Sequence, residues 1–157
     1  MLERSFMRVA LSAPLPGIGP GVRSFEPDDE AALGGLMYRA YLHTVDYDGE
    51  TPGQAALEVS KTIRGEYGAF LPSCSKVFER TGSLVSATLI TRLRGRPFVG
   101  FTFTDPAYSR QGLARQCMQA SMFELVAQGE HELGLLVTMA NTPAVNLYRK
   151  LGFQHET

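Results

Sequence analysis

Four residues near the middle of the chain could bind a phosphate group. Gly112 and Ala114 are small, and Arg110 and Arg115 lie beside them in the sequence. At the start of a helix the backbone N–H groups are free and the dipole end is positive, so an anion can bind there. A glycine lets a ligand approach the backbone, and arginines add charge-assisted hydrogen bonds. A solvated helix start with two surface arginines is the alternative that these residues alone leave open.

The flanking elements would hold this segment between a strand and a helix. Apolar residues alternate with small or polar ones over Phe98–Thr104, which predicts a strand with one apolar face. Pro106 ends the strand, because proline cannot donate to a strand ladder. Apolar residues at a spacing of four then predict a helix from about Ser109 to Val126.

Two segments resemble signatures of the GNAT superfamily of acyl-CoA-dependent N-acyltransferases. Ser109–Ala114, SRQGLA, resembles the Arg/Gln-x-x-Gly-x-Gly/Ala signature. Asn141–Phe153, NTPAVNLYRKLGF, resembles the family's Asn-x-x-Ala-x-x-Leu-Tyr-x-x-Leu-Gly-Phe ending. The resemblance is clear from about Leu84 onward and general before it. One departure is that Ser109 stands where the family has Arg or Gln, which affects a side-chain contact and not the backbone around Gly112.

The resemblance implies both the fold and the acyl donor. The fold would be a single α/β domain over residues 1–157, with a mixed, mostly antiparallel sheet, a central parallel strand pair and about four flanking helices. Two strands would part to admit the arm of acetyl-CoA or another acyl-CoA. Its pyrophosphate would contact the backbone of a segment that we call the phosphate cradle, which consists of Gln111, Gly112, Leu113 and Ala114, with Arg110 and Arg115 beside it.

Three further residues are implied to contact the pantetheine arm. The backbone of Phe103 and Thr104 would pair with it as an added strand would. Asn141 matches the family position that meets the arm from the other side, and it also suits an N-cap of the helix that follows. Both roles are compatible.

Tyr148 lies where the family places a general acid. Coenzyme A leaves as a thiolate that needs a proton, and a phenol with an ordinary pKa of about 10 is protonated at neutral pH. The alternative for Tyr148 is aromatic packing under the cofactor. The sequence names no base clearly, and Glu79 on the neighbouring strand is one candidate.

Three carboxylates lie close together in the turn Val45–Glu50, which we call the acidic loop. They are Asp46, Asp48 and Glu50. The family often borders the acceptor site with this loop, so we expect these residues to bind an amine substrate. Each of them also suits an ordinary turn or surface position.

Composition excludes several other functions. The 157 residues carry a net charge of −1, so no large basic field indicates a nucleic-acid partner. No apolar run is long enough to span a membrane. The two isolated cysteines, Cys74 and Cys117, suit reduced thiols in a cytoplasm. The three histidines show no metal-ligand spacing.

The remaining elements follow from periodicity and capping signals. Residues 1–21 read as an irregular lead-in with a short strand at Met7–Leu11, and Thr51 with Gln54 forms a capping-box pattern. Helices are predicted from Pro27 to about His43, from Pro52 to about Arg64 and over Pro143–Leu151. Strands are predicted over Val22–Phe25, Ser75–Arg80, Leu84–Leu93, Leu133–Met139 and Phe153–Glu156. The short last strand makes a homodimer plausible.

These observations predict a cytoplasmic enzyme that transfers an acetyl or other acyl group from coenzyme A to an amine. The acceptor would be a small molecule or a peptide. Attack would be direct, in a ternary complex, because no cysteine is positioned to form an acyl-enzyme. The alternative is a binding module, an acyl-CoA sensor or regulatory subunit, that has the fold without turnover.

Overall fold

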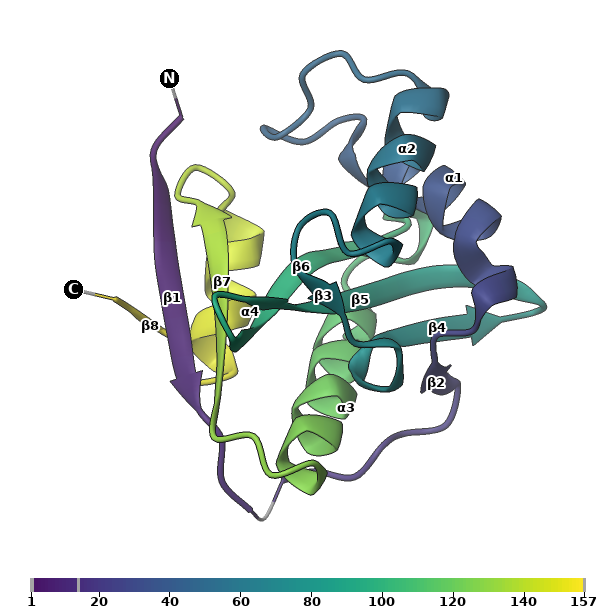
Figure 1. Ribbon diagram of the computed structural model, residues 1–157. Helices are drawn as coiled ribbons and strands as arrows, with labels where there is room; N and C mark the ends of the chain where they lie inside the picture. The colour runs from purple at the N-terminus through teal and green to yellow at the C-terminus, as the bar shows by residue number, and fades with distance from the viewer. Residues whose placement is uncertain (1, 14, 157) are drawn as a thin grey trace.

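The protein forms one twisted eight-stranded sheet with helices on both faces (Figure 1). The computed structural model describes residues 2–13 and 15–156. The strand order is β2-β4-β5-β6-β7-β1-β8, with β3 pairing with β5. The strands are β1 (Arg4–Ala10), β2 (Val22–Ser24), β3 (Ala69–Phe70), β4 (Lys76–Arg80), β5 (Ser83–Leu93), β6 (Arg96–Thr104), β7 (Glu132–Thr138) and β8 (Gln154–His155). The helices are α1 (Glu30–Tyr41), α2 (Pro52–Ile63), α3 (Leu113–Ala127) and α4 (Thr142–Lys150), with 3-10 turns at Pro27–Asp29, Pro72–Cys74 and Pro106–Tyr108.

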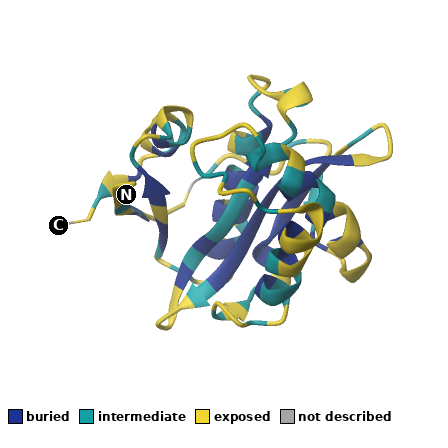
Figure 2. Ribbon diagram, turned by 90° about the horizontal axis from the view of Figure 1, so that it is seen from above, coloured by how far each residue is buried: buried dark blue, intermediate teal, exposed yellow. Residues whose placement is uncertain are grey.

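The two larger of three hydrophobic clusters among the described residues lie on opposite faces of the sheet, and the central strands are buried between them (Figure 2). On one face α1 and α2 pack on β4, β5 and β6 through residues such as Leu36, Val59 and Phe103. On the other face α3 and α4 pack on β1 and β7 through residues such as Met118, Leu135 and Val145. The predicted α/β fold, with a mostly antiparallel sheet, one parallel strand pair and four α-helices, is therefore confirmed.

The parallel pair β6 and β7 separates after two residues. Only Phe98 with Gly134 and Val99 with Leu135 are paired, and beyond them the two strands diverge. The β5–β6 register shifts between Leu89 and Ile90, so Gly100 is an extra residue on β6 at the point of divergence. A bulge bends its strand and increases the local twist. The sheet thus opens into a split whose β6 side runs from Gly100 to Thr104.

The N-terminal segment is more ordered than expected. Instead of a short strand at Met7–Leu11 in an irregular lead-in, Arg4–Ala10 forms a full strand. This strand pairs with the whole of β7, from Arg4 opposite Thr138 to Ala10 opposite Glu132. The last strand is as short as expected, and it pairs with β1 at Met7 and Arg8. The chain's own N-terminal strand therefore lies beside β7, while a homodimer stays a prediction.

Two local expectations were corrected by the structure. The third helix begins at Leu113, four residues later than the predicted start at Ser109, because Arg110 and Gly112 adopt positive φ angles of 62° and 75° that no α-helix contains. Ala69–Phe70 forms a short strand in a segment expected to be loop. The capping box at the start of α2 is confirmed, with Thr51 Oγ1 accepting from the Gln54 N–H at 3.1 Å.

Candidate active site

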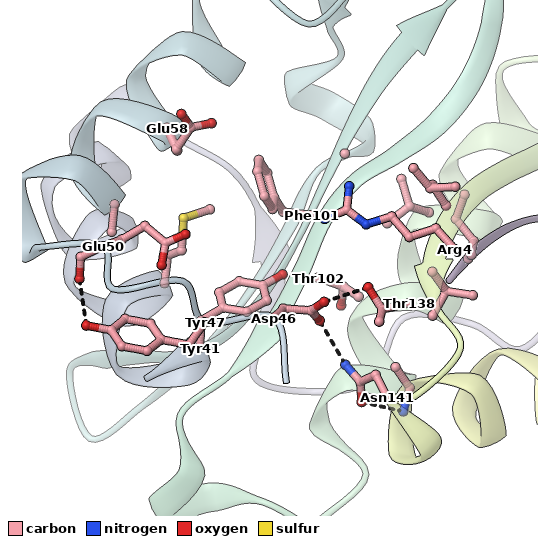
Figure 3. Close-up of a pocket in the computed structure, with 18 of the residues that line it drawn as sticks. Arg4, Tyr41, Asp46, Tyr47, Glu50, Glu58, Phe101, Thr102, Thr138 and Asn141 are labelled. Carbon is pink, nitrogen blue, oxygen red and sulfur yellow. Dashed lines mark hydrogen bonds between the residues drawn. The ribbon is translucent and has the colours of Figure 1, made fainter. Parts of the chain in front are cut away.

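A pocket of about 360 Å³ occupies the split between β6 and β7. Helix α1 and the acidic loop close it on one face of the sheet, and α4 reaches it from the other. Its walls include phenols, carboxylates and one arginine, several of which are drawn in Figure 3. The polar and charged lining residues include Arg4, Tyr41, Asp46, Glu50, Glu58, Thr138, Asn141 and Tyr148.

Asp46 of the acidic loop is held at the end of β7 by two neutral donors (Figure 3). Thr138 Oγ1 donates to Asp46 Oδ1 at 2.6 Å, and Asn141 Nδ2 donates to Asp46 Oδ2 at 3.3 Å. The Asn141 Oδ1 atom accepts from the Ala144 N–H at 3.3 Å, so Asn141 is also the N-cap of α4. The expected cap is present, and the Asn141 amide joins the acidic loop to the split.

Two phenols, the buried Tyr148 and the half-buried Tyr41, lie close to Asp46 and stay protonated. Burial and, to a smaller extent, the Asp46 carboxylate raise the pKa of Tyr148 well above its usual value of about 10. Burial, Tyr148 and Asp46 raise the pKa of Tyr41 in the same direction. The Tyr148 ring also packs against Phe153, with 5.9 Å between the ring centroids. Tyr148 is thus a packed aromatic residue that also lines the pocket and keeps its proton at neutral pH.

Two more carboxylates line the α2 side of the pocket. Glu50 Oε2 accepts from the Asp48 N–H at 2.9 Å, which shapes the acidic loop. Glu58, on α2, accepts a hydrogen bond of 2.7 Å from the Tyr67 hydroxyl. That bond raises the pKa of Tyr67 to about 12. Glu58 is a pocket residue that sequence reasoning missed. Its position next to the buried Val59 was a signal, because it puts the carboxylate at the edge of the inward face of α2.

The phosphate cradle has free donors at the start of α3. The first helical hydrogen bond runs from the Gln116 N–H to the Gly112 oxygen at 3.0 Å. Within the described part of the chain, the N–H groups of Leu113, Ala114 and Arg115 find no acceptor. Gly112 is the N-cap in the left-handed conformation, and a β-carbon there would meet nothing closer than Arg115 Nη2 at 3.8 Å. The cradle is open to an anionic ligand.

Arg80, at the end of β4, supports the cradle from a distant part of the sequence. Its Nη1 donates to Gln111 Oε1 at 2.5 Å. Its guanidinium lies 5.3 Å from the Phe78 ring centroid and 5.7 Å from that of Tyr108. Stacking on two aromatic rings holds an arginine in place. No local motif marks Arg80, so sequence reasoning missed it.

These features fit the groups of acetyl-CoA. The free N–H groups and the positive end of α3 suit a pyrophosphate. Beyond Val99 the edge of β6 that faces the split, which includes the backbone of Thr104, has no strand partner among the described residues and suits an amide-bearing arm. The Phe103 side chain lies in the core against Tyr41, with 6.2 Å between the ring centroids. The Phe103 backbone pairs with Ala87 of β5, and its carbonyl accepts from Ser86 Oγ at 3.3 Å, so the expected contact of the Phe103 backbone with the arm does not fit this edge.

The structure brings some of the predicted site residues together and separates others. Asp46, Glu50, Asn141 and Tyr148 share the pocket. Asp48 does not line this pocket; it lines a second hollow, which Arg4 and Asp46 also line. Glu79 does not line the pocket: it pairs with Arg23 at 3.4 Å on the outer strands. The geometry therefore argues against Glu79 as the base.

Among residues 2–13 and 15–156, no three histidine, cysteine or acidic side chains gather in a way that could hold a metal ion. In the same part of the chain, none of the helices combines the length and the apolar character needed to cross a membrane.

The comparisons with known proteins show the family and the fold. The model of the acetyltransferase (GNAT) family matches residues 38–153. A mycothiol acetyltransferase of Thermobispora bispora is 32% identical over 163 residues, covering 96% of this chain and 53% of that protein. A GCN5-related N-acetyltransferase of Sphaerobacter thermophilus has a TM-score of 0.75 at 20% identity, covering 98% of this chain and 48% of that chain.

A second solved structure is similar over most of its length. It is the PaiA N-acetyltransferase of Thermoplasma acidophilum in complex with coenzyme A, with a TM-score of 0.68 at 14% identity, covering 86% of this chain and 89% of that one. By contrast, the chain spans about half the length of the Thermobispora and Sphaerobacter proteins. Since the family model covers more than half of the sequence, the chain belongs to the GNAT family of acetyltransferases.

Proposed function

We propose that this protein transfers the acetyl group of acetyl-CoA to a primary amine by direct attack. The observation that carries the proposal is the continuity of the site. The free N–H groups of the phosphate cradle come directly after β6 in the chain, and the open edge of β6 lines the same pocket as Tyr148. Acetyl-CoA supplies an activated acetyl thioester. The GNAT relatives give the reaction class, since they are acetyltransferases.

The chain's own groups have separate roles in this proposal. The phosphate cradle, with Arg110 and Arg115 beside it, would hold the pyrophosphate, while the backbone of Thr104 and the Asn141 amide would hold the pantetheine arm. Tyr148 would protonate the departing thiolate, and its raised pKa keeps the proton available across the physiological range.

The pocket carboxylates would bind the ammonium form of the acceptor and accept its proton. An alkyl ammonium with a pKa near 10.4 costs roughly 4.6 kcal/mol to deprotonate at pH 7. Asp46, Glu50 and Glu58 surround the space where the amine would enter, and they would bind the ammonium and accept its proton directly or through water. The ammonium would lose one proton before attack and a second as the amide forms, both to the carboxylates or to water. The N–C bond would form and the C–S bond break, with the sulfur taking a proton from Tyr148. One of the two released protons would then restore the Tyr148 phenol, and the other would leave to solvent.

The test is a screen for acetylated product. The purified protein is incubated with acetyl-CoA and a panel of amino acids, short peptides, diamines and aminosugars, while free thiol release is followed and products are identified by mass. We expect at least one amine to give equal amounts of thiol and acetylated product. Acetyl-CoA binding without product from any amine would instead support the binding module without turnover.

A further inference from the structure

Arg4 is the one arginine that lines the pocket within the described part of the chain, and it has no partner in the structure. It lies on β1, directly opposite Thr138 in the β1–β7 ladder. Side chains opposite each other in antiparallel strands are neighbours on one face of the sheet. Thr138 holds Asp46, so Arg4 stands beside the acidic loop at the acceptor side of the pocket.

Arg4 lies near the acidic loop without forming an ion pair with any described carboxylate. Arg8, on the same strand, pairs with Glu132 at 3.4 Å and with Glu156 at 2.6 Å. The described carboxylates form no such pair with Arg4, although Asp46, Glu50 and Glu58 line the same pocket. Figure 3 shows the Arg4 guanidinium entering from β7's side, across the pocket from Glu50 and Glu58. An arginine and a carboxylate cluster that do not neutralise each other can both bind a ligand that carries both charges.

The acetyl-CoA phosphates do not account for Arg4. The phosphate cradle begins α3, which packs on the face of the sheet opposite to α1 and α2. Arg4 faces the α1 side, because its neighbour Thr138 contacts Asp46 in the loop after α1. An anion at Arg4 would therefore belong to the acceptor.

We propose that the acceptor is a small molecule with a carboxylate as well as an amine, an amino acid or a short peptide, whose carboxylate binds Arg4. This inference rests on the proposed acetyl transfer and narrows its substrate class. The planar guanidinium matches a carboxylate in a two-bond fork, while the ammonium end faces the pocket carboxylates. Arg4 also disfavours polyamines, because a second ammonium group would be placed against it. The pocket volume of about 360 Å³ lies near the lower end of small-molecule sites, about 300–1,000 Å³.

The experiment compares each acceptor with its uncharged carboxamide. Amino acids and dipeptides are assayed beside the corresponding amides, which keep the amine and the side chain and lose only the negative charge. For the wild-type protein we expect kcat/KM for the acid to exceed that for the amide at least tenfold. A comparison of kcat/KM between the amino acids and the dipeptides shows which of these two classes the pocket accepts.

Arg4 variants assign the preference to this side chain. In Arg4→Gln we expect KM for the acid to rise at least tenfold, KM for the amide to change less than twofold, and the affinity for acetyl-CoA to be unchanged. Arg4→Lys should restore part of the preference, and Arg4→Glu should reverse it towards amides and diamines. Arg94→Gln is the matched control, because Arg94 is exposed in the β5–β6 turn outside the pocket.

The possible outcomes separate the Arg4 inference from the proposed acetyl transfer. Equal use of acids and amides by the wild type, or equal losses for both in Arg4→Gln, would overturn the Arg4 inference while leaving acetyl transfer intact. No acetylation of any amine would overturn the proposed function, and the Arg4 inference with it.

Discussion

Replacing Gly112 with alanine should weaken acetyl-CoA binding much more than it weakens the fold. Gly112 has φ 75°, where an L-residue is strained by about 1–2 kcal/mol. A β-carbon there has room in the free protein, since the nearest atom is Arg115 Nη2 at 3.8 Å. It would project at the phosphate cradle, however, and keep a phosphate from the free N–H groups. Losing one charge-assisted hydrogen bond costs about 1.5–3 kcal/mol, or about 10- to 150-fold in affinity.

Gly129→Ala is the matched control for this substitution. Gly129 lies just beyond the other end of α3 with φ 84°, and a β-carbon there would meet nothing within 4 Å. Both variants should therefore lose a similar 1–2 kcal/mol of unfolding free energy in urea titrations. Calorimetric titration should give at least a tenfold weaker acetyl-CoA affinity for Gly112→Ala and less than a twofold change for Gly129→Ala. Equal affinities in the two variants would refute the phosphate cradle.

Three further predictions follow from other parts of the structure. Tyr148→Phe should lower kcat at least tenfold while the affinity for acetyl-CoA stays similar, and unchanged turnover in the variant would exclude the acid role. Because the pKa of Tyr148 is raised, the rate of the wild-type protein should show no decline near pH 10. Arg80→Gln should weaken acetyl-CoA binding about three- to tenfold in calorimetry, because Gln111 loses its hydrogen bond, and should leave the KM of the acceptor unchanged. An effect on the acceptor KM alone would contradict the role of Arg80 in supporting the phosphate cradle. The buried Lys76 ammonium pairs with Glu124 at 3.2 Å, so Lys76→Ala should lower the unfolding free energy in urea titrations by about 2–3 kcal/mol. Lys76→Met should lower it less, because the methionine side chain fills the same space. Equal losses in the two variants would mean that packing at this position matters little.

Local signals in the sequence predicted the elements that depend on neighbouring residues. Thr51 and Gln54 lie three residues apart, and they cap α2 as expected because capping needs only this spacing. The strand at Phe98–Thr104 follows from alternation, and Gly112 marks the cradle because a positive φ favours glycine. The start of α3 was placed too early, since nothing in the local pattern shows that Arg110 also adopts a positive φ.

The site residues that sequence reasoning missed depend on contacts between distant segments. The Thr138–Asp46 hydrogen bond joins residues 92 positions apart. The sequence therefore showed three carboxylates in the acidic loop but not which of them the fold holds at the end of β7. Arg4 reaches the pocket only because β1 pairs with β7, and that pairing joins opposite ends of the chain. The Glu79 candidate was unsupported because its partner, Arg23, comes from β2, which pairs with β4. Pairings of this kind follow from topology and not from local spacing.

Calorimetric titration of the purified protein with acetyl-CoA tests the central claim most directly. Free coenzyme A, NAD and ATP serve as comparison ligands. The free donors of the phosphate cradle and the open edge of β6 predict saturable, one-to-one binding of acetyl-CoA and of coenzyme A, with NAD and ATP much weaker because they lack the pantetheine arm. Absence of binding by acetyl-CoA and by longer acyl-CoAs, in a folded sample, would contradict the account.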